Sequence, residues 1–206
     1  MATATEPATL RVPNADAPFD LTSDLYSRMV EAGLIPRDRR VYLRGGKLYE
    51  KIAKTKAHGS IGAAITWAIT RRLPNAWSLW PESTIVLDAI NAPLPDFAVI
   101  RSGELMGRAN PERYPGPNDV ALIIEIAVIS LRDDLTTALE LYARAGIPAY
   151  WVVDVPSRRI LAHGEPRIVE GRGEYARVET YRSGDTLPLL LDGVEAIRVP
   201  FDELLR

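Results

Sequence analysis

The sequence predicts an α/β (α+β) fold in which a mixed β-sheet is flanked by helices. The first observation is the run at residues 120–129 (VALIIEIAVI), whose β-branched and aliphatic residues follow the turn-rich segment PGPND. Such a run is typical of a strand buried on both faces. The second observation is the order of elements, because this strand is followed by a helix at 135–145 and another strand at 149–154. A helical crossover between strands favours a mixed sheet.

The N-terminal part is expected to form a short helix and a hairpin. Residues 23–32 have apolar side chains at helical spacing, and Gly33 is a left-handed helix stop. Two strand-like runs at 40–44 and 47–53 flank a Gly-Gly pair, which is a two-residue hairpin signal. Glu50 lies between apolar neighbours in the second run, so alternation places its carboxylate on the inner face, where it is costly without a partner.

The other expected elements follow in order. They are a helix at 58–73, short strands at 77–80 and 84–87, a strand opened by Asp96, and, from Arg158, short strands that end in a helical turn at 201–205. A long polar loop at 101–119 separates the Asp96 strand from the central one. Compact domains usually keep such loops short, which indicates a role for this loop.

Composition predicts one ordinary globular domain at residues 21–206, preceded by a flexible N-terminal arm at residues 1–20. The chain has 206 residues, of which 47% are hydrophobic and 25% charged. It contains no cysteine, which excludes disulfides, thiolate metal sites and cysteine nucleophiles, and fits a cytoplasmic location. No apolar stretch reaches the length of a membrane span, so a membrane partner is not expected.

Positive charge is concentrated in one part of the chain. Residues 37–72 contain ten Lys or Arg against two acids, a local charge of +8 (ten minus two), although the net charge is −2. The only four lysines of the chain are in this segment: Lys47, Lys51, Lys54 and Lys56. A basic segment on an acidic body indicates a phosphate-bearing partner such as nucleic acid. The alternative is a solvated surface hairpin.

Three further residues are candidates for a functional site. Glu125 lies in the middle of the buried strand, so it needs a cationic partner, a metal ion, a hydrogen-bond network or a raised pKa. Asp96 follows Pro95, and His58 begins a helix, where an imidazole could orient a carboxylate or contact phosphate. Each also has a structural explanation, namely a Glu paired with Arg, an Asp that ends a turn, and an exposed His.

The chain resembles the Uma-two family of putative restriction endonucleases, within the PD-(D/E)XK superfamily. Six features carry this resemblance: Glu50, His58, LPD ending at Asp96, IIE ending at Glu125, the separation of 29 between those two acids (125 minus 96), and the block LYARAGIPAYWVVD at 141–154.

The resemblance implies a restriction-endonuclease-like sheet flanked by helices and a metal-dependent endonuclease that acts on DNA. Asp96 and Glu125 would be the ligands of Mg²⁺ or Mn²⁺, with Glu50 and His58 completing the catalytic site. Lys47, Lys51, Lys54 and Lys56 would contact the nucleic-acid backbone. The superfamily and the frequency of symmetric assemblies also point to a homodimer.

The chain departs from the family pattern at the lysine. The superfamily usually has a lysine two residues after the Glu, or in a neighbouring element, but Ala127 and Ala138 occupy these two places. Tyr42 likewise replaces a commonly acidic residue. A substitute for the lysine must therefore come from the basic hairpin or its loop, or from Arg132. These departures leave open a degenerate active site, and the alternative function is a catalytically inactive paralogue that binds nucleic acid or another protein.

Overall fold

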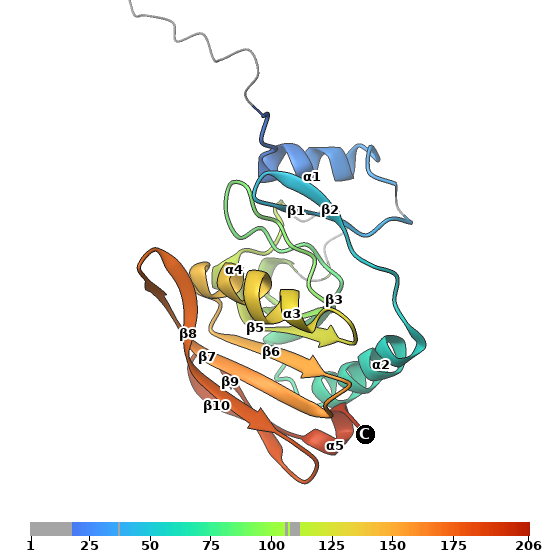
Figure 1. Cartoon of the computed structure of the whole chain (residues 1–206), viewed down its shortest axis with the longest axis vertical. Coiled ribbons are helices and arrows are strands. Elements are labelled where there is room, and N and C mark those ends of the chain that lie inside the picture. Colours follow the sequence, from blue (N-terminus) through green and yellow to red (C-terminus); the bar gives the residue numbers. More distant parts are fainter. Residues whose placement is uncertain (1–17, 37, 106, 108–111) are drawn as a thin grey trace, which may run out of the picture.

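The structure, a computed structural model, describes residues 18–36, 38–105, 107 and 112–206. Most of the predicted N-terminal arm lies outside these residues. The chain then forms α1 (Ser23–Glu31) and a hairpin of β1 (Val41–Arg44) and β2 (Lys47–Glu50), which lie together at one end of the molecule (Figure 1). The hairpin and its Gly-Gly turn are confirmed, with both glycines at positive φ. The second strand is shorter than predicted, since it ends at Glu50.

A six-stranded mixed sheet forms the centre of the molecule, as predicted. Its strand order is β3-β4-β5-β6-β7-β8, and every neighbouring pair is antiparallel except β5 and β6. The strands are β3 (Trp77–Pro81), β4 (Phe97–Arg101), β5 (Val120–Ala127), β6 (Ala149–Asp154), β7 (Arg159–Val169) and β8 (Arg172–Tyr181).

Two expectations about strands were wrong. Residues 84–87 form no strand, although Ile85 and Leu87 are buried. The region after Arg158 does not consist only of short strands, because β7 and β8 have 11 and 10 residues and complete the central sheet. Short turns between them had indicated short strands, but β7 and β8 pair with each other along almost their whole length.

Helices cover both faces of this sheet. On one face lie α3 (Leu131–Asp133), a π-helical turn (Asp134–Ala138) and α4 (Leu139–Arg144), which together form the crossover from β5 to β6. On the other face lie α2 (Lys56–Thr70), the hairpin of β9 (Thr186–Leu191) and β10 (Val194–Pro200), and α5 (Phe201–Leu204). Short 3₁₀ turns occur at Gly103–Leu105 and Pro117–Asp119. Within the described part of the chain, we find no helix with the length and hydropathy of a membrane span.

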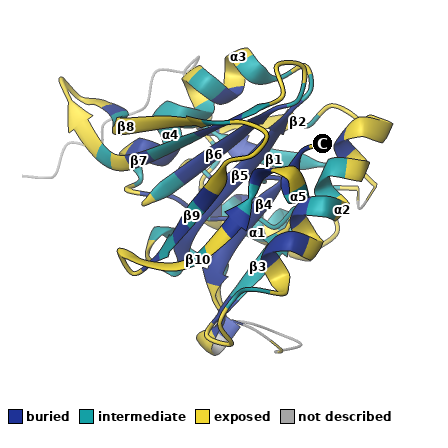
Figure 2. Cartoon of the chain, turned by 90° about the horizontal axis from the view of Figure 1, so that it is seen from below, coloured by how far each residue is buried: buried dark blue, intermediate teal, exposed yellow. Residues whose placement is uncertain are grey.

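The central strand β5 is buried along its whole length, and Figure 2 shows it within the buried middle of the sheet. Leu122, Ile124 and Ile126 pack toward α2 and the β9–β10 hairpin, whereas Ile123 packs toward α4. A bulge opposite Val99 and Ile100 breaks this alternation at the start of the strand. Beyond the bulge the side chains alternate between the two faces, so Glu125 faces the side covered by the π-helical turn and α4.

Candidate active site

Two buried carboxylates meet on neighbouring strands. Asp96 immediately precedes β4 and Glu125 lies in β5, and the antiparallel register pairs Phe97 with Ile124. The residues are 3% and 6% exposed. The backbone N–H of Asp96 donates to Glu125 Oε2 at 3.3 Å, and that of Ile126 donates to Asp96 Oδ2 at 2.9 Å. The backbone of each strand therefore fixes the carboxylate of the other, which places both acids at one end of the sheet.

Lys51 lies between these two carboxylates. Its Nζ donates to Asp96 Oδ1 at 3.0 Å and to Glu125 Oε2 at 2.9 Å. The residue comes directly after β2, on the segment that runs along one side of the molecule to α2 (Figure 1). The cation beside Glu125 is thus a lysine of the basic segment and not an arginine. Its role as a substitute for the missing lysine stays a prediction. Arg40 adds a longer contact, with its Nη2 3.9 Å from Asp96 Oδ1.

Two further side chains hold the outer oxygens of the pair. His58 Nε2 is 3.0 Å from Asp96 Oδ2, and the Tyr142 hydroxyl donates to Glu125 Oε1 at 3.0 Å. His58 lies in the first turn of α2, where the Thr55 hydroxyl accepts its backbone N–H, and it is only 9% exposed. The alternative of an exposed, purely surface histidine is therefore wrong, and the imidazole orients a carboxylate.

Burial and the neighbouring charges move the pKa values of these groups in different directions. Burial and the nearby acids raise the pKa of Glu125 to about 8, although Lys51 opposes this shift. Burial would also raise the pKa of Asp96, but the His58 hydrogen bond and the Lys51 charge hold it well below its usual range. Burial lowers the pKa of Lys51, yet the charges of Glu125 and Asp96 hold it well above the ordinary value. The ammonium form of Lys51 is therefore strongly favoured.

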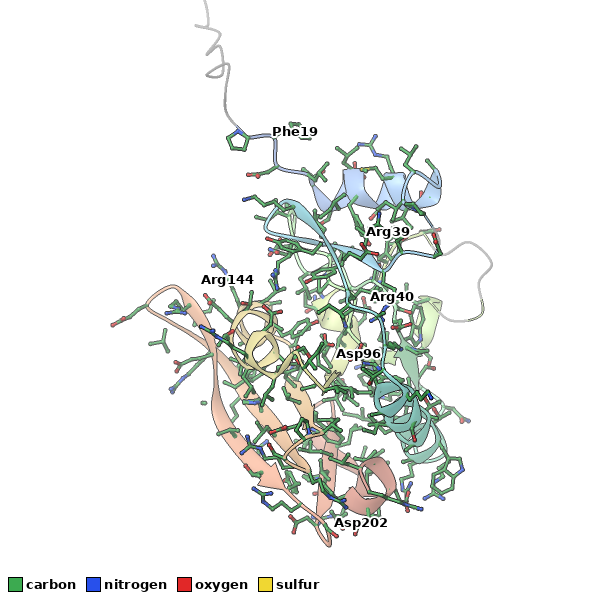
Figure 3. The ribbon with its side chains drawn as sticks, turned by 45° about the vertical axis from the view of Figure 1, so that its right-hand side comes forward. Phe19, Arg39, Arg40, Asp96, Arg144 and Asp202 are labelled. Carbon is green, nitrogen blue, oxygen red and sulfur yellow. The ribbon has the colours of Figure 1, made fainter. Side chains whose placement is uncertain are left out.

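The pair opens into a pocket of about 670 Å³. Its walls come from the hairpin, the segment after β2, the end of β5 and the π-helical turn. Figure 3 shows Arg40 and Asp96 near the middle of the molecule, between the hairpin and α2, with Arg39 farther toward α1. Cationic side chains on the pocket wall are Arg40, Arg44, Lys51, Lys54 and Arg132. Positive charge therefore surrounds the carboxylate pair on the wall of this pocket.

The predicted inner-face position of Glu50 was wrong. All four residues of β2 are exposed, and the Glu50 carboxylate pairs with Arg39, whose Nε donates at 2.9 Å. Its side chain is 43% exposed and lines the rim of the pocket, without a contact to the two buried carboxylates. Alternation could not show this, because a two-stranded ribbon has no buried face unless another element covers it. A catalytic role for Glu50 stays a prediction.

Most of the basic segment forms ion pairs with acids from other parts of the chain. Lys54 Nζ is 2.9 Å from Glu82 Oε1, and Arg44 Nη1 is 3.1 Å from Asp133 Oδ2. Among the described residues, Lys47 and Lys56 have exposed side chains with no ion-pair partner. Of the four lysines predicted to contact nucleic acid, these two are the most available, while Lys51 is engaged inside the site.

Asp134 and Tyr142 are site residues that the sequence prediction missed. Asp134 begins the π-helical turn, is 7% exposed and accepts a hydrogen bond from Ser130 Oγ at 2.6 Å. Residues 134, 138 and 142 recur at intervals of four on the helical segment that covers Glu125. A polar residue in that apolar pattern was the available signal. Ala127 and Ala138 both belong to the hydrophobic layer between this segment and the sheet. Neither of the two positions where the family usually has its lysine therefore holds a charge here.

A model of the Uma2 (Uma-two) family, described as "Putative restriction endonuclease", matches residues 24–199. The chain belongs to this family. The Uma2 match spans the hairpin, all strands of the central sheet and every site residue named above. No curated protein matches the chain.

A solved structure confirms the fold. It is described as "a putative nuclease belonging to DUF820 from Anabaena variabilis ATCC 29413" and is 13% identical in sequence to this chain. The similarity covers 80% of this chain and 88% of the other, with a TM-score of 0.62. At this identity the likeness concerns the restriction-endonuclease-like fold alone.

Asp96 and Glu125 could supply two ligands of a divalent cation at the position of the Lys51 ammonium group. Asp96 Oδ1 and Glu125 Oε2 both point at one position, which the Lys51 ammonium group occupies. In the described ranges, no group of three or more His, Cys, Asp or Glu could hold a metal ion. Mg²⁺ is commonly held by one or two carboxylates together with water and substrate phosphate, so two carboxylates are a sufficient protein contribution.

Proposed function

We propose that the protein is a metal-dependent endonuclease that hydrolyses phosphodiester bonds in DNA. The observation that carries this proposal is the convergence of Asp96 Oδ1 and Glu125 Oε2 on one cationic position, 3.0 and 2.9 Å from Lys51 Nζ, in a pocket open to solvent. Membership of the Uma2 family supports the same chemistry. A homodimer and a cytoplasmic location stay predictions.

Asp96 and Glu125 would hold Mg²⁺ or Mn²⁺. When bound, the ion would polarise the phosphodiester and lower the pKa of the attacking water. His58 and Tyr142 keep the two carboxylates oriented through the outer oxygens, so that the inner oxygens stay directed at the cation. Positioned groups of this kind reduce the reorganisation needed during the reaction.

Lys51 is proposed to supply the positive charge that family members usually obtain from a lysine at the positions of Ala127 or Ala138. Its ammonium group reaches both carboxylates from the segment after β2 and keeps a side-chain exposure of 21%, so it also faces the pocket. With an ion between the carboxylates, the ammonium group would move toward the pocket, where it would stabilise the negative charge that develops on the phosphate oxygens of a bound phosphodiester. Lys47, Lys54 and Lys56 would contact the backbone of the DNA farther from the scissile bond.

Cleavage of plasmid DNA by the purified protein, with Mg²⁺ or Mn²⁺ and with EDTA, tests the proposal. We expect metal-dependent nicking that falls at least 10²-fold in Asp96→Ala and in Glu125→Ala, because each change removes a ligand. Glu174→Gln is the matched control, since Glu174 pairs with Arg167 on the surface and does not line the pocket. We expect it to keep most of the activity. Equal cleavage by the parent and by both alanine variants would show a contaminating nuclease and refute the proposal.

A second candidate function is a catalytically inactive paralogue that binds nucleic acid or another protein. The observation that favours it is again Lys51, because its ammonium group already compensates both carboxylates without a metal ion. An inactive site of this kind would contribute to stability alone. Metal-dependent turnover that is abolished by Glu125→Ala would exclude this candidate.

A further inference from the structure

Asp134 differs from the other acids of the pocket in having a free oxygen. Five carboxylates line the pocket: Glu50, Asp96, Glu125, Asp133 and Asp134. Arg39 engages both oxygens of the first, Arg44 contacts both oxygens of Asp133, and the buried pair is engaged on all four oxygens. Only one oxygen of Asp134, Oδ2, accepts a hydrogen bond within the described part of the chain, and the donor is Ser130.

The surroundings of Asp134 hold it beside the carboxylate pair. Tyr150 donates its hydroxyl to the Asp134 carbonyl at 3.0 Å, and its ring packs against Tyr142 with centroids 5.1 Å apart. Tyr142 in turn donates to Glu125. Asp134 also opens a π-helical turn, a rare conformation that often occurs at functional sites. Asp134 is therefore a buried acid that is fixed in position, lines the pocket and keeps one carboxylate oxygen without a hydrogen bond among the described residues.

Asp134 is not placed to be a third metal ligand. Asp134 lines the same pocket as Asp96 and Glu125, but the three carboxylates do not form a group that could hold one metal ion. Within the described residues, no other group of three His, Cys, Asp or Glu could hold one either. Its carboxylate can therefore serve a different step. The step that remains without a residue in the proposed function is acceptance of the proton from the attacking water.

We propose that Asp134 is the general base of this site and accepts a proton from the water that attacks the phosphorus of a bound phosphodiester. This inference rests on the proposed function. The water oxygen forms a bond to phosphorus, one water proton moves to the free Asp134 oxygen, and the bond from phosphorus to the leaving sugar oxygen breaks. Solvent water protonates the leaving oxygen, and Asp134 returns its proton to solvent. The products are a phosphomonoester and an alcohol.

The charges around Asp134 suit this role. Burial raises its pKa to about 6, while the Ser130 hydrogen bond and the charge of Lys51 oppose that shift. Asp96 and Asp133 raise it further, and Glu125 is a third acid on the same side. A base works best when its pKa lies near the operating pH, because it is then both available and able to hold a proton.

The first experiment compares Asp134→Asn with the matched control Asp133→Asn in the Mn²⁺-dependent cleavage assay. We expect Asp134→Asn to lower kcat about 10²-fold or more and to remove the acid limb of the pH–rate profile near pH 6. The control should change kcat less than about threefold, because Asp133 pairs with Arg44 at the surface. It should move the acid limb slightly to lower pH, because the Asp133 charge raises the pKa of Asp134. Mn²⁺ affinity, measured by electron paramagnetic resonance on the uncleaved complex, should be unchanged in both variants.

The second experiment uses Ser130→Ala, which keeps the acid and removes the hydrogen bond that lowers its pKa. We expect the acid limb of the profile to move to higher pH. Parental kcat and pH profile in Asp134→Asn, loss of Mn²⁺ binding in that variant, or an unmoved limb in Ser130→Ala would each overturn the general base and leave the proposed nuclease intact. Absence of metal-dependent cleavage by the parent protein would overturn both.

Discussion

Replacing Lys51 with methionine removes the ammonium group but keeps an apolar stem of similar length. The change leaves Asp96 and Glu125, whose side chains are 4% and 8% exposed, without the cation that bridges them. Removing one partner of a buried ion pair typically costs about 3–5 kcal/mol. His58 and Tyr142 still bind the outer oxygens, and Glu125 can take up a proton, so we expect a loss near the lower limit, about 3 kcal/mol.

Differential scanning calorimetry at pH 7.5 provides the measurement. A loss of about 3 kcal/mol corresponds to a fall in Tm of roughly 6–12 °C for a protein of this size. Lys54→Met is the matched control, because Lys54 pairs with Glu82 nearer the surface, where such pairs contribute about 0–1 kcal/mol.

Added Mn²⁺ separates a metal site from a purely structural ion pair. An ion present at a hundred times its dissociation constant stabilises the folded protein by about 2.7 kcal/mol. We expect Mn²⁺ to raise the Tm of Lys51→Met more than that of the parent, since in the parent the Lys51 ammonium group occupies the position between the two carboxylates. A Tm for Lys51→Met equal to that of the parent would refute the bridging role. An equal lack of response to Mn²⁺ in both proteins would count against the metal site.

Two further predictions concern residues at the site, and one concerns His163 on β7. Tyr142→Phe removes the hydrogen bond to Glu125 Oε1 and leaves a buried acceptor without a partner. Urea titration should therefore show a free energy of unfolding lower by about 1–3 kcal/mol. A decrease below about 0.5 kcal/mol would contradict this reasoning. Burial lowers the pKa of His163 to about 4, so the unfolded chain binds a proton more readily than the folded protein between pH 6.5 and 4. The free energy of unfolding of the parent should therefore fall over this range, by roughly 2 kcal/mol after allowance for solvent screening. Urea titrations at pH 7 and 4.5 should show a smaller pH dependence of this free energy in His163→Phe. In the Lys51→Met background, Ala138→Lys should recover part of the lost cleavage, because Ala138 lies one turn before Tyr142 on the segment that covers Glu125. If the double variant folds but cleaves no faster, a cation from this helix cannot replace Lys51.

The central sheet and its pair of acids could be predicted because burial dominates both. The long apolar run around Glu125 determined the central strand, and the order of strand, strand, helix and strand determined the mixed sheet. A carboxylate in such a strand requires a charged or hydrogen-bonding partner, so the sequence alone indicates a polar site there. Asp96 was found with it because the two acids came in the family's order and spacing.

The hairpin and the turn around Asp134 were harder to predict for different physical reasons. The period-2 pattern placed Glu50 on an inner face, but the hairpin is a separate two-stranded sheet whose second strand is exposed. That strand ends at Glu50, so alternation does not decide where the Lys51 side chain points. Asp134 lies where the helix widens into a π turn, which shifts the helical phase that sequence patterns assume. In both places the outcome depends on contacts with distant parts of the chain.

The position of Lys51 has a consequence for how relatives of this protein are compared. The ammonium group beside Glu125 comes from a residue 74 positions away in the chain, directly after a hairpin outside the central sheet. A residue-by-residue comparison at positions 127 and 138 would classify the chain as having lost its lysine, although a lysine nitrogen lies within 3.0 Å of both acids. A lineage could gain the hairpin lysine first and lose the helical one later without passing through an uncompensated pair of buried carboxylates. Relatives are therefore better compared by where positive charge lies around the two acids than by the residues at positions 127 and 138 alone.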